Sequence, residues 1–176
     1  MAALESLRQA RCPSEVELRE APAPTRVASF AVALEAVAYH PGGEEASLGS
    51  LILLHEPAGH SVWEGDFRAV TVAKASVEDE LGPDPFLAQV AWSWLAEALE
   101  GLDLVGRPAG TVTRTISESF GSLGTKANHT GLEVRASWTP AGPAMGPHLE
   151  AWLGFLAKMG GVMLSPAGVT ALRPRH

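Results

Sequence analysis

The stretch from Asp84 to Gly101, DPFLAQVAWSWLAEALEG, decides the fold that we expect for the chain. Asp84 is a suitable N-cap, Pro85 suits the first helical position, and Gly101 suits the end of a helix. At ~100° per residue, the apolar side chains between them cover an arc of roughly 240°, whereas a surface helix usually shows an apolar stripe of about 100°. We therefore predict a central, buried helix, with Trp92 and Trp94 in different parts of the core.

Apolar spacing on either side of this helix predicts the other elements. We expect helices over residues 2–11, 25–38 and 147–159, a short strand around Val16 and Leu18, and strands over 51–55, 67–77, 111–120 and 132–138. Segments rich in proline and glycine are expected to form a loop at 40–50, a turn at 56–60 and a connector at 106–110.

These elements predict an α+β fold, namely an antiparallel or mixed sheet of four to five strands with a central buried helix and further helices mainly on one face. We assign residues 1–164 to a single domain and residues 165–176 to a flexible C-terminal tail. The last two predicted strands have a preferred register. Pairing Ile116 with Val134, and Val112 with Trp138, aligns their apolar faces, whereas a slip of one residue would set an apolar face against a polar one.

The composition limits the function. The chain has 176 residues, 46% of them hydrophobic, and a formal net charge of −7 from 13 Lys+Arg and 20 Asp+Glu. The lack of a basic stripe argues against nucleic acid, and against an anionic membrane surface, as a partner. No apolar run reaches the ~18 residues of a membrane span. The N-terminal residues lack the apolar core of a signal peptide, and the single Cys12 cannot form an internal disulfide. We expect a cytoplasmic protein.

The densest group of polar side chains lies in residues 55–68, HEPAGHSVWEGDFR. Imidazole and carboxylate groups are suitable metal ligands, and HEPAGH superficially resembles the zinc-protease pattern HExxH. The spacing here is HExxxH, and Pro57 and Gly59 exclude the helix that would place both histidines on one face. We interpret the segment as a solvated hairpin turn with Trp63 folded onto the sheet edge. The alternative is a metal or ligand site on this loop.

Arg114 and Glu118 raise a separate question. By alternation they lie on the same strand face as Ile116, but four residues of strand place them ~13 Å apart, so they cannot pair directly. Each needs its own partner, because a buried unpaired charge is costly. We expect either ion pairs across the sheet or a sheet end open to water, and the functional alternative is a polar pocket at the strand ends. That candidate ligand pocket would contain His55, His60, Trp63, Glu64, Arg68, Arg114 and Glu118.

No catalytic set can be assembled from the sequence. Cys12 lies by itself in the N-terminal segment, no GxSxG pattern is present, and we expect neither a cofactor nor a metal. We therefore favour a non-catalytic binding or regulatory module that acts through protein–protein contacts, with another protein or a second copy of the chain as partner. The alternative is a small enzyme or ligand-binding protein that uses the polar pocket. Convergence of its residues around a concave site would distinguish the two.

Four segments resemble an uncharacterised actinobacterial protein family, a family of a domain of unknown function. They are LLHEPAGHSVWEGDFRAVT, DPFLAQVAWSWLAEALE, GTVTRTISESFG and EVRASWTP. The resemblance covers roughly residues 5 to 160, and the WSWL and RASWTP patterns are its most specific parts. It implies an actinobacterial cytoplasmic protein and brings no activity, cofactor or catalytic residue. The order of helices and hairpins is also similar to that of secretion chaperones, in pattern only.

Overall fold

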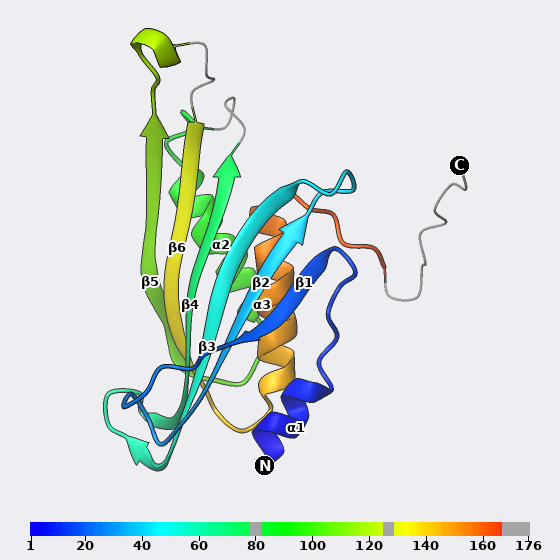
Figure 1. Ribbon diagram of the computed structural model, residues 1–176. Coiled ribbons are helices and arrows are strands. Elements are labelled where there is room, and N and C mark those ends of the chain that lie inside the picture. The colour runs from blue at the N-terminus through cyan, green and yellow to red at the C-terminus, as the bar shows by residue number, and fades with distance from the viewer. Residues whose placement is uncertain (78–81, 125–128, 167–176) are drawn as a thin grey trace, which may run out of the picture.

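The structure is a computed structural model that describes residues 1–77, 82–124 and 129–166. In these parts of the chain, six strands form an antiparallel sheet and three α-helices cover one of its faces (Figure 1). The elements follow in the order α1 (Ala2–Arg8), β1 (Val16–Ala21), β2 (Phe30–Tyr39), β3 (Glu45–His60), β4 (Gly65–Val77), α2 (Leu87–Leu99), β5 (Leu104–Ser117), β6 (His129–Pro140) and α3 (Met145–Met159). The α+β class is confirmed, and the sheet has more strands than predicted.

The strand order is β1-β2-β3-β4-β6-β5. Along the chain, α2 connects β4 to β5, which is an edge strand of the sheet. The next strand, β6, lies between β4 and β5 in the sheet. Directly paired residues of antiparallel strands point to the same face. Gly49, Ala73, Val134 and Val112 therefore form one row across β3, β4, β6 and β5, on the face that the helices cover. The neighbouring row, which includes Val72, lies on the opposite face.

α3 occupies the centre of the helical layer. Trp152 and Leu156 are fully buried against the sheet, and Trp152 Nε1 donates a hydrogen bond to Thr71 Oγ1 of β4 at 2.7 Å. The helix comes close to β3 at Gly49, where an added Cβ would lie 3.2 Å from atoms of both Trp152 and Leu156. This close approach makes α3 the buried central helix of the molecule.

α2 exists as predicted, but the prediction that it is central and buried is wrong. It begins at Leu87, after a turn in which Asp84 Oδ1 accepts a hydrogen bond from the Phe86 amide at 2.8 Å. Trp92 and Trp94 are only partly buried. The buried residues recur at every fourth position and form a narrow stripe: Leu87, Ala91, Leu95 and Leu99. The helix thus buries one stripe, as a surface helix does.

The predicted helix over residues 25–38 is wrong, because Phe30–Tyr39 is strand β2. Its apolar residues alternate at period two as well as at helical spacing, and the row Val32, Leu34, Ala36 and Ala38 pairs with helix-facing residues of β3. The flanking strands β1 and β3 satisfy the backbone groups on both sides of β2. This non-local gain overrides the helical spacing of the apolar residues.

β3 is also longer than predicted, because it contains the turn predicted at 56–60 and the end of the loop predicted at 40–50. The β3–β4 register shifts between the pairs His55↔Phe67 and His60↔Gly65. A bulge thus accommodates the proline and glycine residues of this segment within the strand, including Gly59 at a positive φ of 78°. The chain turns at residues 61–64 instead.

β5 likewise runs through the connector predicted at 106–110, with a register shift between Val105 and Ala109. The predicted hairpin register is wrong by four residues, since Val112 pairs with Val134, and Ile116 with Thr130. The shift is even, so the apolar faces still match, as the prediction required. Alternation therefore identified the correct faces but could not fix the offset along the strand.

The predicted tail at 165–176 begins with Ser165, whose amide and hydroxyl both donate hydrogen bonds to Glu15 Oε1, at 2.9 and 2.6 Å. Residues 167–176 lie outside the described residues. None of the helices that the structure describes is long and apolar enough to cross a membrane.

Candidate functional site

A row of three aromatic rings crosses β2, β3 and β4 at one end of the sheet. Phe30 pairs with His55, and His55 pairs with Phe67, so all three side chains lie on the helix-covered face. The His55 ring stacks on Phe67 with ring centroids 4.3 Å apart and an interplanar angle of 7°. It also stacks on Phe30 at 5.8 Å and 28°. Strand pairing therefore holds the imidazole between two phenyl rings.

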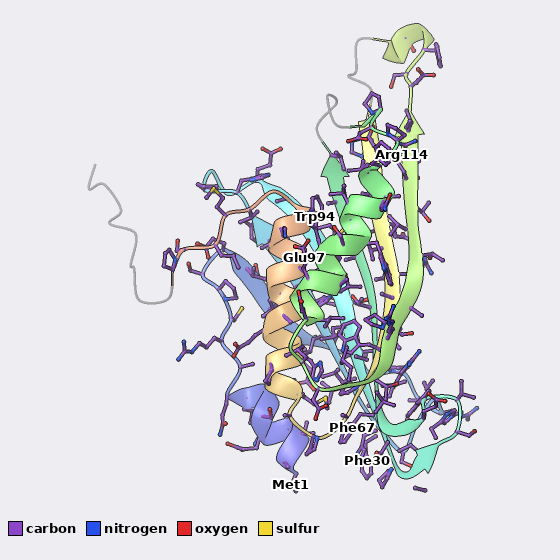
Figure 2. All side chains as sticks on the ribbon, turned by 180° about the vertical axis from the view of Figure 1, so that it is seen from behind. Met1, Phe30, Phe67, Trp94, Glu97 and Arg114 are labelled. Carbon is purple, nitrogen blue, oxygen red and sulfur yellow. The ribbon has the colours of Figure 1, made fainter. Side chains whose placement is uncertain are left out.

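A largely apolar cavity of about 410 Å³ lies between this row and α1. Met1, Leu4 and Leu7 line it from the N-terminal segment, and Met145 lines it from the start of α3. Figure 2 shows Met1, Phe30 and Phe67 together at one end of the sheet, with Arg114 at the opposite end. The cavity has the size of sites that hold a small ligand, and it would also take a large apolar side chain.

α1 covers the cavity and is held at its C-terminal side. None of its residues is buried. The Gly146 amide of α3 donates a hydrogen bond to Ser6 Oγ at 2.8 Å, and an added Cβ on Gly146 would lie 2.5 Å from the Ser6 carbonyl oxygen. The Arg11 amide donates to Glu150 Oε1 at 2.8 Å. Glycine at 146 thus lets α1 sit directly on the first turn of α3, above the cavity.

The apolar lining continues onto the outer surface. Phe30 is 62% exposed and Leu4 is 43% exposed, although both line the cavity. His55 is the polar side chain in this wall, and the structure records no hydrogen bond from its ring to any described residue. The site therefore offers an apolar surface, inside and at its rim, with one imidazole that can donate or accept a hydrogen bond.

Arg68 lies on the opposite face of the sheet from His55. Its Nη1 donates to Thr139 Oγ1 at 2.9 Å and its Nη2 to Ser137 Oγ at 2.7 Å. Thr139 Oγ1 in turn donates to the Trp63 carbonyl oxygen at 2.8 Å. Burial lowers the pKa of the Arg68 guanidinium below its ordinary range. Arg68 therefore ties the β3–β4 hairpin to β6.

His60, Trp63 and Glu64 form the tip of this hairpin. The His60 ring stacks on Trp63 with centroids 4.2 Å apart, and its Nδ1 is buried without a hydrogen-bond partner in the described structure. Glu64 is exposed in the turn at a φ of +57°. Among the described residues, no three His, Cys, Asp or Glu side chains gather closely enough to hold a metal ion. The segment is a hairpin, as interpreted, with Trp63 half-buried.

Arg114 and Glu118 lie at the other end of the sheet. Arg114 Nη1 donates to the carbonyl oxygens of Asp84, at 2.5 Å, and Gly82, at 3.3 Å, so its partner is the backbone just before α2. Glu118 is exposed just beyond the end of β5. About 23 Å of β6 separates this end from the Arg68 end, at about 3.3 Å per residue.

The seven residues of the predicted pocket thus occupy three places: the aromatic row, the hairpin tip with Arg68, and the far end of β5. They do not surround one cavity. Sequence reasoning identified His55 but missed the cavity beside it. Phe30 was assigned to a helix, although its period-two alternation would have placed it on a strand. Nothing in the sequence indicates that Leu4 and Leu7 face that strand.

A model of the family described as "Protein of unknown function (DUF3000)" matches residues 1–170. No curated protein and no solved structure matches the chain.

Proposed function

The chain belongs to the DUF3000 family of proteins of unknown function, and from this premise we propose that it is a non-catalytic binding module whose site is the apolar cavity under α1. The proposed ligand is a large apolar side chain, or a short apolar segment, of a partner protein. We also propose a cytoplasmic location and an actinobacterial source, which the resemblance of the WSWL and RASWTP segments supports.

The continuity between the cavity and its exposed rim supports a protein ligand most strongly. Phe30 and Leu4 line the cavity and remain exposed outside it. A small molecule would fill the cavity and leave this rim in water, whereas a protein segment would cover both. Apolar side chains buried at the centre of such a contact supply most of the binding free energy. His55 would donate or accept a hydrogen bond from the backbone of the bound segment.

A small apolar ligand is the second candidate function. The cavity volume of about 410 Å³ falls within the range of small-molecule sites. The stacked rings of Phe30, His55 and Phe67 would form an aromatic wall for such a ligand. Under this alternative, binding would depend on the side chains that line the cavity, Leu4 among them, and not on the apolar surface outside it.

Selection of random peptides displayed on phage would test the proposal. We expect the wild-type protein to select peptides that share a large apolar residue, and we expect Leu4→Asp to weaken their binding by about tenfold or more, since it places a charge at the mouth of an apolar site. Val90→Asp is the matched control, because Val90 is about as exposed as Leu4 but lies on α2. It should leave the affinity unchanged.

A dye that binds apolar sites, 8-anilinonaphthalene-1-sulfonate, separates the two candidates. If no peptide is selected, but the wild-type protein binds the dye and Leu4→Asp does not, the cavity is a site for a small molecule and not for a protein segment. Peptides that bind wild type and Leu4→Asp equally would place the site elsewhere and contradict the proposal. Thermal melts followed by circular dichroism would show that each variant is folded.

A further inference from the structure

β5 is the last strand at one edge of the sheet, so one side of its backbone has no strand partner among the described residues. It is long, Leu104–Ser117, and its second half, TVTRTIS, carries a single charge. β1, at the other edge, has six residues, VELREA, and half of them are charged. Short, charged edge strands resist pairing with another strand, whereas a long edge with few charges is a template for it. β5 is therefore the edge at which a further strand can add.

The side chains of β5 that face the helices form an exposed, alternating row. Val112, Arg114 and Ile116 share this face. Glu118 and Phe120 follow the end of β5 at Ser117, and a strand that continued through Phe120 would place them on the same face. Ile116 is 55% exposed and Phe120 is 77% exposed. The row thus presents apolar side chains with one positive and one negative charge between them.

We propose that the strand that adds to β5 is β5 of a second copy of this chain, antiparallel to the first and related to it by a two-fold axis at Ile116. This pairing places Arg114 opposite Glu118 of the second copy and Val112 opposite its Phe120, while the two Ile116 side chains meet on the axis. On the other face, threonine and serine hydroxyls lie opposite one another. The helices of both copies lie on the same face of the joined sheet.

Charge complementarity selects this register over its neighbours. An axis at Arg114 or at Glu118 would place like charges opposite each other, which is destabilising. An axis at Thr115 or at Ser117 would place each charge opposite an apolar side chain of the second copy. Only the axis at Ile116, among these five, pairs each charge with its opposite and each apolar side chain with another.

Within one chain, Arg114 and Glu118 each keep hydrogen-bonding groups that are free to make this pairing. Arg114 donates to the backbone before α2 through Nη1, so its Nε and Nη2 groups remain to bind a carboxylate. The structure records no hydrogen bond or ion pair between Glu118 and any described residue. This interface lies at the opposite end of the sheet from the cavity under α1 and does not depend on the proposed function.

Sedimentation velocity over a range of concentrations tests the proposal by charge reversal. We expect wild type to dimerise and Glu118→Arg to raise the dimer dissociation constant about tenfold or more, since each interface loses two ion pairs and gains like charges. The double variant Arg114→Glu with Glu118→Arg should restore the dimer dissociation constant to within about threefold of the wild-type value. Glu100→Arg, which reverses an exposed acid just after α2, is the matched control and should leave the dissociation constant unchanged.

Oxidative cross-linking tests the register itself. In a Cys12→Ser background, we expect Ile116→Cys to form a disulfide-linked dimer, because residues paired on the axis are within disulfide distance. Ser119→Cys should not, since its opposite residue would be Thr113. A wild-type protein that stays monomeric at every measurable concentration would overturn the proposal. So would a dimer that is indifferent to the charge reversals, or equal cross-linking at both positions.

Discussion

α2 and α3 look alike in sequence but differ greatly in burial. α2 has 13 residues and buries four of them, whereas α3 has 15 and buries ten. α3 lies over the middle strands β2, β3 and β4 and has α1 on one side and α2 on the other, while α2 lies over β5 and β6 at the sheet edge. The position of a helix over the sheet, and not its own apolar content, decides how much of its surface is buried.

Truncating a tryptophan on each helix should give the largest difference. Trp152→Ala removes a fully buried ring of α3 and its hydrogen bond to Thr71, so we expect the free energy of unfolding to fall by about 3–5 kcal/mol. Trp94→Ala removes the same atoms from a partly buried site on α2 and should cost less than half as much. Urea denaturation followed by circular dichroism measures both, and equal losses would contradict the comparison.

Two substitutions within α2 test how narrow its buried stripe is. Leu95→Ala should lower the free energy of unfolding by about 2–4 kcal/mol, because Leu95 is fully buried. Val90→Ala should cost under about 1 kcal/mol, because Val90 lies outside the stripe and is exposed. If Val90→Ala lowers the free energy of unfolding as much as Leu95→Ala does, then α2 buries a wide arc of its surface, as predicted from the sequence.

The burial of α3 should also make stability depend on pH through His148. Its Nδ1 accepts a hydrogen bond from Trp138 Nε1 at 3.2 Å, and burial lowers the pKa of His148 below its ordinary 6.5, an effect that Asp103 partly opposes. The unfolded chain therefore binds this proton more readily than the folded chain. The stabilisation is complete above pH 6.5 and is lost as the pH falls below it.

Urea denaturation between pH 7.5 and 5.5 would measure this dependence, in a range above the ordinary pKa of carboxylates. His148→Gln is the control, because it keeps an acceptor for Trp138 but does not titrate. We expect the stability difference between wild type and this variant to shrink as the pH falls. If this difference stays constant between pH 7.5 and 5.5, His148 does not contribute to the pH dependence of stability.

The smallest effect should come from the ion pair that joins the two helices. Lys158 Nζ lies 2.7 Å from Glu97 Oε2, and both side chains are at least half exposed (Figure 2 labels Glu97 on α2). A double-mutant cycle with Glu97→Gln and Lys158→Gln should give a coupling free energy of about 0.2–1 kcal/mol that falls as salt is added. A larger coupling would mean that this surface contact helps to hold α2 in place.

Local patterns predicted those parts of the fold that local physics decides. α2 and α3 were predicted because their apolar residues recur at helical spacing over more than three turns. β4 was predicted because its alternation is clear from Phe67 to Val77. β2 was missed because its sequence fits both periods, and only its pairing with β1 and β3 decides between them. The register of β5 with β6 was missed because several even offsets match the same faces.

The candidate site was harder to predict, because it is made by contacts between distant parts of the chain. His55 belongs to the polar segment 55–68, but its stacking partners come from two other strands. The cover of the cavity comes from α1, which Gly146 admits to the first turn of α3. No spacing within any one segment carries this information, so the sequence offered single residues of the site without their arrangement.

The central place of α3 also bears on how the chain is made. The ribosome produces β1 to β4 first and the helix that covers β2, β3 and β4 afterwards. Until then, the nascent chain exposes the apolar side of these strands, including the glycine at 49 that receives Trp152. Such an intermediate is a target for chaperones and proteases. A polypeptide that stops before Met145 should therefore aggregate or be degraded in cells.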